Sequence, residues 1–221
     1  MPPHPLPDHR KRMLRLSRLP TLRIAMTGWS ASGKTVYARL LAQALDCAYV
    51  SGSAMLLQRL EQPADADWID ARAALQAARH SSAADRDADA ALVARVRESD
   101  RVLADSWTAP WLLGDDVVKL WIDCGEETRV KNATLGFGPL SDAQVRRVRD
   151  GLREKDADSV ALFRELHGFT LGPDPLVFDA VVDATPYFGH VREKWPQERR
   201  VFLDRLVDEV HRAAQRKGLL R

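Results

Sequence analysis

The fold of this chain is decided by one stretch, Gly28-Trp29-Ser30-Ala31-Ser32-Gly33-Lys34-Thr35. The stretch matches the phosphate-loop pattern G-x-x-x-x-G-K-[ST] at every fixed position. The two glycines allow the backbone N–H groups to surround a phosphate in a conformation that other residues adopt poorly. Lys34 can reach the β- and γ-phosphates of a nucleotide, and the Thr35 hydroxyl can ligate Mg²⁺. We therefore predict that all the residues of this stretch bind ATP or a similar polyphosphate together with Mg²⁺.

The residues on either side of the loop supply the context that such a motif needs. Residues 22–26 are short and mostly apolar, which is typical of a buried strand. Residues 36–45 carry apolar side chains at near-helical spacing, and a helix beginning at the loop would point its positive end at the anion. A chance glycine turn is the alternative, and the order of strand, loop and helix argues against it.

Composition bounds the class of protein. A chain of 221 residues can bury a full core and hold one domain with a subdomain. No stretch approaches the roughly 18 apolar residues of a membrane span, and the first residues lack the apolar core of a secretory signal. Cys47 and Cys124 are far apart and are predicted to be buried free thiols. We expect a cytoplasmic monomer without a membrane partner.

The formal net charge of +2 is unevenly distributed. The first 20 residues contain five prolines, four of them within the first seven residues, and Asp8 is their only acidic residue. Their basic residues are Arg10, Lys11, Arg12, Arg15 and Arg18. This composition predicts a flexible basic tail over residues 1–20, followed by one domain over residues 21–221. A basic tail on a slightly acidic body is poor support for nucleic-acid binding, so the expected partner is a small-molecule or nucleotide acceptor.

Further short apolar strands are predicted at residues 47–50, 101–105, 117–123 and 180–185, with helices between them. Strands that alternate with helices predict an α/β fold with a parallel sheet. Two helical regions extend this scheme. Residues 51–100 form a helical insertion on the acceptor side, and residues 136–168 contain a long helix that opens with a capping box of Ser141 and Gln144.

Asp105 ends one of these predicted strands, where a carboxylate would lie beside the phosphate loop. It can hold Mg²⁺ together with Thr35, or it can accept the proton of an acceptor hydroxyl. A strand-end aspartate that caps a turn is the alternative. Trp107 and Trp111 follow at once, and they either stack against an acceptor ring or close the core.

An acidic run, Asp85, Asp87 and Asp89, could be mistaken for a metal site. Residues two apart diverge on a helix, so we expect a solvated first turn instead.

The long helix after Ser141 is strongly basic, at Arg146, Arg147, Arg149, Arg153 and Lys155. A solvated face is the ordinary explanation of such a run. The Gly-Pro approach at residues 136–139 favours a lid that closes on phosphates during transfer. Phosphoryl transfer needs cations, because negative charge spreads over the equatorial oxygens in the transition state. Arg149 or Arg153 is therefore predicted to act with Lys34 and Asp105 in catalysis.

Together these features resemble the nucleoside monophosphate kinases, and within them the cytidylate kinase-like family, over about residues 22–190. The segments 153–156 (REKD) and 163–168 (FRELHG) are similar to the family's lid helix, which ends R-x-[RK]-D and then aromatic-x-E-hydrophobic-Tyr-Gly. The segment 178–185 (FDAVVDAT) is similar to its closing strand. The resemblance implies a five-stranded phosphate-loop NTPase fold, ATP with Mg²⁺, and transfer to a pyrimidine monophosphate.

The departures from this pattern lie on the acceptor side. Leu56 or Leu57 stands where the family has one arginine for the acceptor phosphate, and Trp107 replaces a second. The positions that read cytosine in bacterial members align with Ser159 and Leu162. Losing two arginine–phosphate contacts costs on the order of several kcal/mol of acceptor binding. We therefore predict an ATP-dependent kinase for a small hydroxylated acceptor. A true CMP/dCMP kinase and a non-catalytic nucleotide sensor are the alternatives, and a nucleic-acid kinase is a third.

Overall fold

The computed structural model describes residues 9–59, 82–135, 137–188 and 195–220. The middle of the predicted 51–100 insertion lies outside the described residues. The centre of the structure is a parallel sheet in the order β2-β3-β1-β4-β5. Its strands are β1 (Leu22–Gly28), β2 (Ala48–Ser51), β3 (Arg101–Asp105), β4 (Val118–Asp123) and β5 (Ala180–Asp183). The predicted α/β class, with a five-stranded parallel sheet flanked by helices, is confirmed.

The central strands are almost continuously apolar because both of their faces are covered by helices. In β1 every residue except Arg23 is buried. Met26 of β1 lies opposite Asp105 of β3, and Gly28 lies opposite Ile122 of β4. The carboxyl ends of these strands therefore share one edge of the sheet, which is where ligands bind in open parallel sheets.

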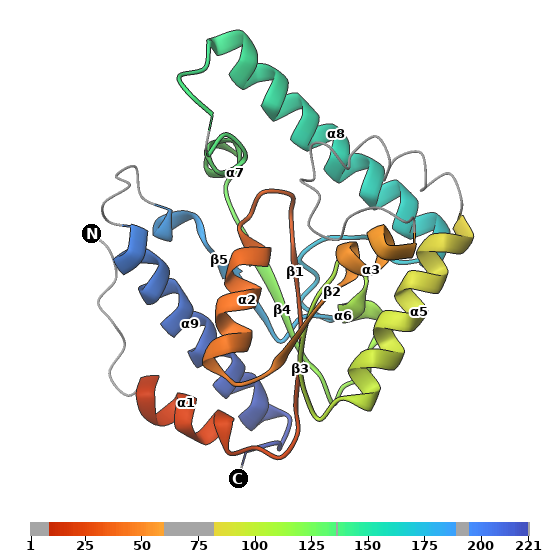
Figure 1. Ribbon diagram of the computed structural model, residues 1–221, viewed down its shortest axis with the longest axis vertical. Coiled ribbons are helices and arrows are strands. Elements are labelled where there is room, and N and C mark those ends of the chain that lie inside the picture. The colour runs from red at the N-terminus through yellow and green to blue at the C-terminus, as the bar shows by residue number, and fades with distance from the viewer. Residues whose placement is uncertain (1–8, 60–81, 136, 189–194, 221) are drawn as a thin grey trace.

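Helices α2 (Lys34–Ala44) and α9 (Trp195–Arg216) cover one face of the sheet. Their apolar sides meet β1 in a core that includes Ile24, Tyr37 and Phe202. Helices α5 (Ser82–Glu98) and α6 (Ala109–Leu112) cover the other face, and α3 (Gly52–Arg59) packs on α5 (Figure 1). Leu92 and Val96 of α5 are fully buried on this side. Two cores thus hold the sheet between layers of helices.

The segment expected to be a flexible tail is helical from His9 onward. Helix α1 (His9–Ser17) packs on α9 through the fully buried Leu16. Arg12 forms a 2.5 Å ion pair with Asp208 of α9, and the Arg101 guanidinium donates to the carbonyl groups of Leu16 and Leu19 at the end of α1. Over residues 9–17 the expected flexible tail is therefore corrected, because Leu16 is buried against the domain and Arg12 has an acidic partner on α9.

The remaining elements lie above the carboxyl edge of the sheet. Helix α7 (Glu126–Ala133) follows β4, and helix α8 (Asp142–His167) extends across the top of the molecule (Figure 1). The predicted capping box of Ser141 and Gln144 is present at the start of α8. A short 3-10 turn, η1 (Thr185–Tyr187), follows β5. The C-terminal end of α8 is anchored by Phe163, which packs with Trp121, Leu171 and Phe178.

Within the described residues, none of the helices has the length and apolarity required to cross a membrane.

Candidate active site

The phosphate loop connects β1 to α2, and its geometry explains both glycines. Gly28 has a φ of 157°, and a Cβ atom at this position would lie 2.2 Å from the carbonyl oxygen of Ile122. Gly33 has a φ of 83°, and its Cβ would lie 2.5 Å from the Phe188 ring. No side chain fits at either position without moving its neighbours. The loop can therefore keep this shape only with glycine at both ends.

The loop carries buried polar groups that are suited to a phosphate. Among the described residues, the hydroxyl oxygens of Ser30 and Ser32 are buried and have no hydrogen-bond partner. A buried hydroxyl without a partner is costly, and an anion in the loop would satisfy it. The N-terminus of α2 points at the same place and adds its own N–H groups. The residues present therefore fit a bound polyphosphate.

Thr35 and Asp105, predicted as metal ligands, meet at the mouth of the loop. The Thr35 hydroxyl donates a 2.7 Å hydrogen bond to Asp105 Oδ2, and Tyr49 OH donates to the same oxygen at 3.0 Å. Burial, with the Asp105 charge as the next cause, raises the pKa of Tyr49 to about 12, so it remains a donor. Hard oxygen ligands of this kind suit Mg²⁺. In the described part of the chain no group of three or more His, Cys, Asp or Glu side chains could hold a metal. Thr35 and Asp105 would supply two oxygen ligands to Mg²⁺, and phosphate oxygens and water commonly supply the others.

Lys34 lies between the loop and the tryptophan that follows β3. Its Nζ donates to the carbonyl oxygen of Trp29 at 3.3 Å and lies 5.4 Å from the centre of the Trp107 ring. Burial lowers the pKa of Lys34, while the charges of Asp105 and Asp156 act in the opposite direction. An anion bound at the loop would stabilise this ammonium, which makes Lys34 a natural partner for a phosphate.

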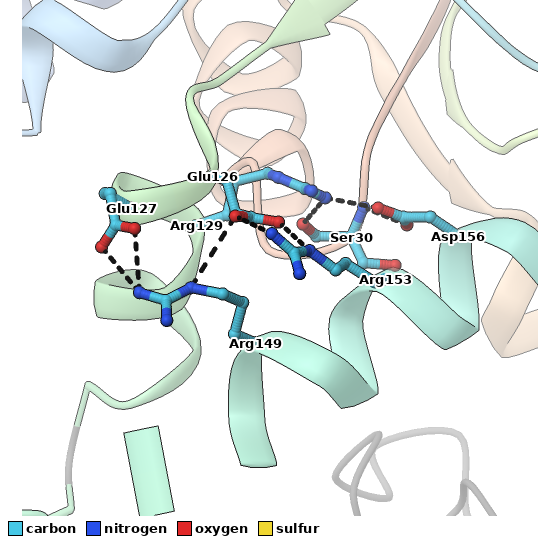
Figure 2. Close-up of polar contacts among 7 residues, drawn as sticks. All are labelled: Ser30, Glu126, Glu127, Arg129, Arg149, Arg153 and Asp156. Atoms are coloured by element: carbon cyan, nitrogen blue, oxygen red, sulfur yellow. Dashed lines mark hydrogen bonds and ion pairs between the residues drawn. The ribbon is translucent and has the colours of Figure 1, made fainter. Parts of the chain in front are cut away.

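Side chains of α7 and α8 make polar contacts with the phosphate loop, as Figure 2 shows for Arg129 and Asp156 at Ser30. The backbone N–H of Ser30 donates to Asp156 Oδ1 at 3.1 Å. Arg129 donates to the carbonyl oxygen of Ser30 at 3.1 Å and pairs with Asp156 Oδ2 at 2.5 Å. Asn132 adds a 3.0 Å hydrogen bond to the carbonyl oxygen of Ala31. Helix α7 and the middle of α8 are therefore both bonded directly to the phosphate loop.

Arg149 and Arg153, predicted as catalytic, are placed differently in the structure. Both point at α7, where Arg153 makes two hydrogen bonds to Glu126 and Arg149 makes two to Glu127 (Figure 2). Neither residue lines the cavity beside the phosphate loop. The structure brings together Lys34, Thr35 and Asp105, but it does not bring these two arginines to them.

A cavity of about 850 Å³ adjoins the phosphate loop. This volume is within the range of small-molecule sites. Its phosphate end is lined by Ser30, Ala31 and residues 33–36 of the loop and α2. The rest is lined by α3, α5, α8 and the segment after β3. The side chains on this second part include Leu56, Asp85, Asp89, Ser106, Trp107, Thr108, Leu152, Lys155, Asp158, Leu162 and Phe163. One continuous space therefore extends from the phosphate loop to a mixed polar and aromatic part of the cavity, called the second compartment below.

The two tryptophans after β3 have different roles. Trp107 lines the cavity, with the ammonium groups of Lys34 and Lys155 at 5.4 Å and 5.7 Å from its ring centre. Trp111 stacks on Phe169 with ring centres 4.4 Å apart and packs edge-on against Phe178. Of the two alternatives left open by the sequence, Trp107 is placed to contact a ligand and Trp111 closes the core.

The acidic run on α5 is not the solvated turn that the sequence suggested. Asp87 is exposed, but Asp85 is only 6% exposed, and both Asp85 and Asp89 line the cavity. Asp89 Oδ1 accepts a 2.5 Å hydrogen bond from the Thr108 hydroxyl, and its Oδ2 lies 2.8 Å from His167 Nε2. Residues four apart share one helix face, so the spacing of Asp85 and Asp89 was the signal that sequence reasoning missed.

Sequence reasoning also missed Arg129, Tyr49 and the separate position of Lys155. Lys155 was grouped with the basic run of α8, yet its side chain faces the cavity whereas Arg149 and Arg153 face α7. Helical spacing indicates that Arg149 and Arg153 share a face and that Lys155 lies on another. It does not indicate which face turns toward the cavity, because that depends on how α8 packs against the domain. No local signal identified Arg129 or Tyr49.

Comparison with known proteins supports the fold and extends no further. Neither the protein-family models nor the curated proteins give a match to the sequence. A solved structure of an uncharacterized protein from Eubacterium ventriosum is similar at a TM-score of 0.59, with 12% identity over 86% of this chain and 98% of that one. A shikimate kinase from Bacteroides thetaiotaomicron has a TM-score of 0.49 at 12% identity, covering 84% and 98% of the two chains. A gluconokinase from Sinorhizobium meliloti has a TM-score of 0.45 at 13% identity, covering 87% and 97%.

The likeness to the Eubacterium ventriosum protein shows a shared fold, without bearing on activity. The sheet order and the glycine-bounded loop between β1 and α2 define the chain as an α/β protein of the phosphate-loop class.

Proposed function

We propose that this chain is an ATP-dependent phosphotransferase that transfers the γ-phosphoryl group to a hydroxyl of a small molecule. The observation that carries the proposal is the single cavity that joins the phosphate loop, with Lys34, Thr35 and Asp105, to a second compartment under α5 and α8. A kinase must hold donor and acceptor in line within one space from which water is excluded. The cavity is large enough for both sets of groups.

Each residue of the phosphate end has a definable task in this reaction. The loop N–H groups and the hydroxyls of Ser30 and Ser32 would bind the β- and γ-phosphates, and Lys34 would neutralise charge that develops during transfer. Thr35 and Asp105 would hold Mg²⁺, which supplies charge neutralisation and orientation of the phosphates when bound. Lys155, on the opposite wall of the cavity, would add a second cation beside the transferring group.

The predicted catalytic role of Arg149 and Arg153 stays a proposal, and it requires a change in their ion pairs. These arginines would have to exchange Glu126 and Glu127 for phosphate oxygens before they could act. Lys155 already lines the cavity, whereas Arg129 contacts the loop at the Ser30 carbonyl group and is paired with Asp156. We infer that Lys155 supplies the cation on the α8 side of the cavity.

The acceptor compartment supports a substrate without a phosphate group. Leu56 and Trp107, which stand where the cytidylate kinase-like pattern has arginines, both line the cavity. No arginine is among the described lining residues, and the carboxylates of Asp85, Asp89 and Asp158 are. A nucleotide phosphate would meet these carboxylates without a bidentate partner. Membership of the cytidylate kinase-like family, with a remodelled acceptor site, is part of this proposal.

A nucleotide sensor is the second candidate, and one contact favours it. Asp156 of α8 is bonded to the Ser30 N–H, so a nucleotide entering the loop must rearrange the attachment of α8. A sensor would use this movement for a partner and would not turn over. It would have no need of the second compartment of the cavity, which is why the kinase is preferred.

The test is ADP release from ATP–Mg²⁺ in the presence of single acceptors: CMP, dCMP, UMP, AMP, free nucleosides and aromatic alcohols. Lys34→Ala serves as the blank, and Lys131→Ala, on an exposed position of α7, is the matched control for the loss of a lysine. We expect an unphosphorylated hydroxyl compound to stimulate release. Stimulation by CMP alone would identify a CMP kinase and contradict the acceptor assignment. Tight ATP binding without stimulation by any compound would favour the sensor.

A further inference from the structure

Asp89 is a carboxylate held in place from two sides at the wall of the acceptor compartment. Its Oδ1 accepts from the Thr108 hydroxyl at 2.5 Å, and its Oδ2 meets His167 Nε2 at 2.8 Å. The three residues come from different elements: α5, the segment after β3, and the last residue of α8. A carboxylate has about four lone-pair positions. Two contacts therefore orient the group and leave it able to accept a further hydrogen bond.

The neighbours of Asp89 are themselves fixed. Ser106 Oγ lies 3.1 Å from the Thr108 hydroxyl and accepts from the N–H groups of Thr108 and Ala109. The His167 ring stacks on the Phe169 ring at an interplanar angle of 8°. Two groups that hold Asp89 are thus positioned by further contacts of their own. Such preorganisation is expected of a side chain whose exact direction matters for chemistry.

Asp105, the carboxylate that meets Thr35 of the phosphate loop, is already engaged. Asp105 Oδ2 accepts from both the Thr35 hydroxyl and Tyr49 OH at the phosphate end of the cavity. Asp105 is therefore placed with the donor phosphates and their metal. Asp89 lines the same cavity but lies among α5, Thr108 and the end of α8, on the acceptor side. The geometry separates a donor-side carboxylate from an acceptor-side one.

We propose that Asp89 binds the reacting hydroxyl of the acceptor and takes up its proton, and that His167 and Thr108 are positioning residues for Asp89. This inference rests on the proposed kinase function. In the step, the acceptor O–H bond breaks and its proton passes to the Asp89 carboxylate. The acceptor oxygen forms a bond to the γ-phosphorus as the bond from that phosphorus to the bridging oxygen breaks, and ADP leaves with that electron pair.

The assignment also narrows the acceptor class. A carboxylate that must accept a hydrogen bond selects a hydroxyl and repels an anion. The compartment offers further acceptors at Asp85 and Asp158, hydroxyls at Ser106 and Thr108, and the face of Trp107. Carboxylates and hydroxyls suit a molecule with several O–H or N–H donors, while the ammonium groups of Lys34 and Lys155 already lie 5.4 Å and 5.7 Å from the centre of the Trp107 ring. We therefore expect a polyol or an amino alcohol as the acceptor.

The test compares Asp89→Asn with Asp87→Asn, which removes the same charge from an exposed position of the same helix. The asparagine Oδ1 can still accept from Thr108, so folding should be retained, as checked by thermal unfolding. ADP release is measured with ATP–Mg²⁺ and glycerol, myo-inositol, D-glucose, ethanolamine or choline. ATP binding is measured separately by titration of tryptophan fluorescence. We expect Asp89→Asn to lower acceptor-stimulated kcat by about 100-fold or more with unchanged ATP binding. Asp87→Asn should match the wild type.

The positioning role of His167 is tested by comparing kcat with the KM for ATP, because a purely structural defect would not change kcat alone. His167→Ala should lower kcat without changing the KM for ATP, and His167→Gln, which can restore one hydrogen bond to Asp89, should recover most of it.

The possible results distinguish failure of the Asp89 assignment from failure of the proposed kinase function. Stimulated turnover in the wild type that survives in Asp89→Asn would overturn the role of Asp89 and leave the kinase standing. Tight ATP binding by the wild type without stimulation by any hydroxyl compound would overturn the kinase and this inference together. Equal losses in Asp89→Asn and Asp87→Asn would show an effect of helix charge alone and would also overturn the assignment.

Discussion

Asp156 accepts a hydrogen bond from the backbone N–H of Ser30, which precedes it by 126 residues in the chain. The Ser30 N–H belongs to the loop that is built to bind a phosphate, so the carboxylate is an anion at the edge of an anion site. Its other oxygen is paired with Arg129, which also donates to the Ser30 carbonyl group. This contact makes the attachment of α8 dependent on what the loop binds.

Replacing Asp156 by alanine should destabilise the protein and increase its response to nucleotide. Arg129 would be left buried without its partner, which costs about 3 kcal/mol of unfolding free energy. A bound triphosphate would then supply the missing negative charge, so the rise in melting temperature with ATP–Mg²⁺ should be larger than in the wild type. Thermal unfolding with and without nucleotide measures both effects. Asp150→Ala, exposed on the same helix, is the control. Equal nucleotide shifts in Asp156→Ala and wild type would contradict the coupling.

Lys155 and Arg153 should differ in their effect on turnover, although they are two residues apart on α8. Lys155 faces the cavity, so Lys155→Ala should lower kcat by about 10-fold or more. Arg153 is exposed and bonded to Glu126, so Arg153→Ala should change kcat by less than about 3-fold. Steady-state kinetics of both variants, with the acceptor identified by the ADP-release test, measures these two changes in kcat. A loss in Arg153→Ala as large as that in Lys155→Ala would show that the arginine leaves Glu126 during the reaction.

Lys34→Met should abolish nucleotide binding. It should also remove the pH-dependent loss of unfolding free energy that comes from burying the Lys34 ammonium. Burial lowers the pKa of Lys34, so the unfolded chain binds more protons than the folded one between the two pKa values. The stability of the wild type therefore rises with pH through that range, as the folded ammonium loses its proton. The methionine variant lacks this contribution. The difference in unfolding free energy between Lys34→Met and wild type should shrink as the pH rises from 7 to 10. Chemical denaturation of both proteins at several pH values measures this difference. A difference that stays constant with pH would contradict the effect of burial on the pKa of Lys34.

The N-terminal helix should matter for stability and not for turnover. Asp208 is fully buried and its ion-pair partner is Arg12, so Arg12→Ala should cost about 3 kcal/mol of unfolding free energy. Arg10→Ala, at an exposed position of α1, should change stability by less than about 0.5 kcal/mol. The kcat of folded Arg12→Ala should equal that of the wild type. Loss of activity with a steep dependence on salt would instead favour a nucleic-acid substrate.

Much of the fold follows from local patterns. The apolar run of β1, the glycines of the loop and the apolar spacing of α2 each have a local physical cause, and the capping box of α8 is readable from Ser141 and Gln144 alone. The tail was misjudged because composition says nothing of distant partners. Arg12 and Leu16 are ordered by Asp208 and the apolar side of α9, which lie almost 200 residues later in the sequence.

The candidate site divides in the same way. Lys34, Thr35 and the loop lie within one short stretch, and Asp105 could be added because parallel strands place their carboxyl ends at one edge. Asp89, Arg129, Lys155 and His167 could not be assigned in this way. Each lies on a helix, and the direction in which a helical side chain points is set by the packing of that helix against the rest of the chain.

The sequence by itself therefore determined the phosphate loop, the α/β class and the position of Lys34, Thr35 and Asp105 beside that loop. These features depend on backbone geometry and on short-range spacing. The tertiary structure alone decided which faces of α5, α7 and α8 turn toward the loop. By doing so it paired Arg149 and Arg153 with glutamates, brought Lys155 to the cavity, and joined Asp89 to His167. These contacts connect residues far apart in the chain, and only the docking of whole helices brings them within hydrogen-bonding distance.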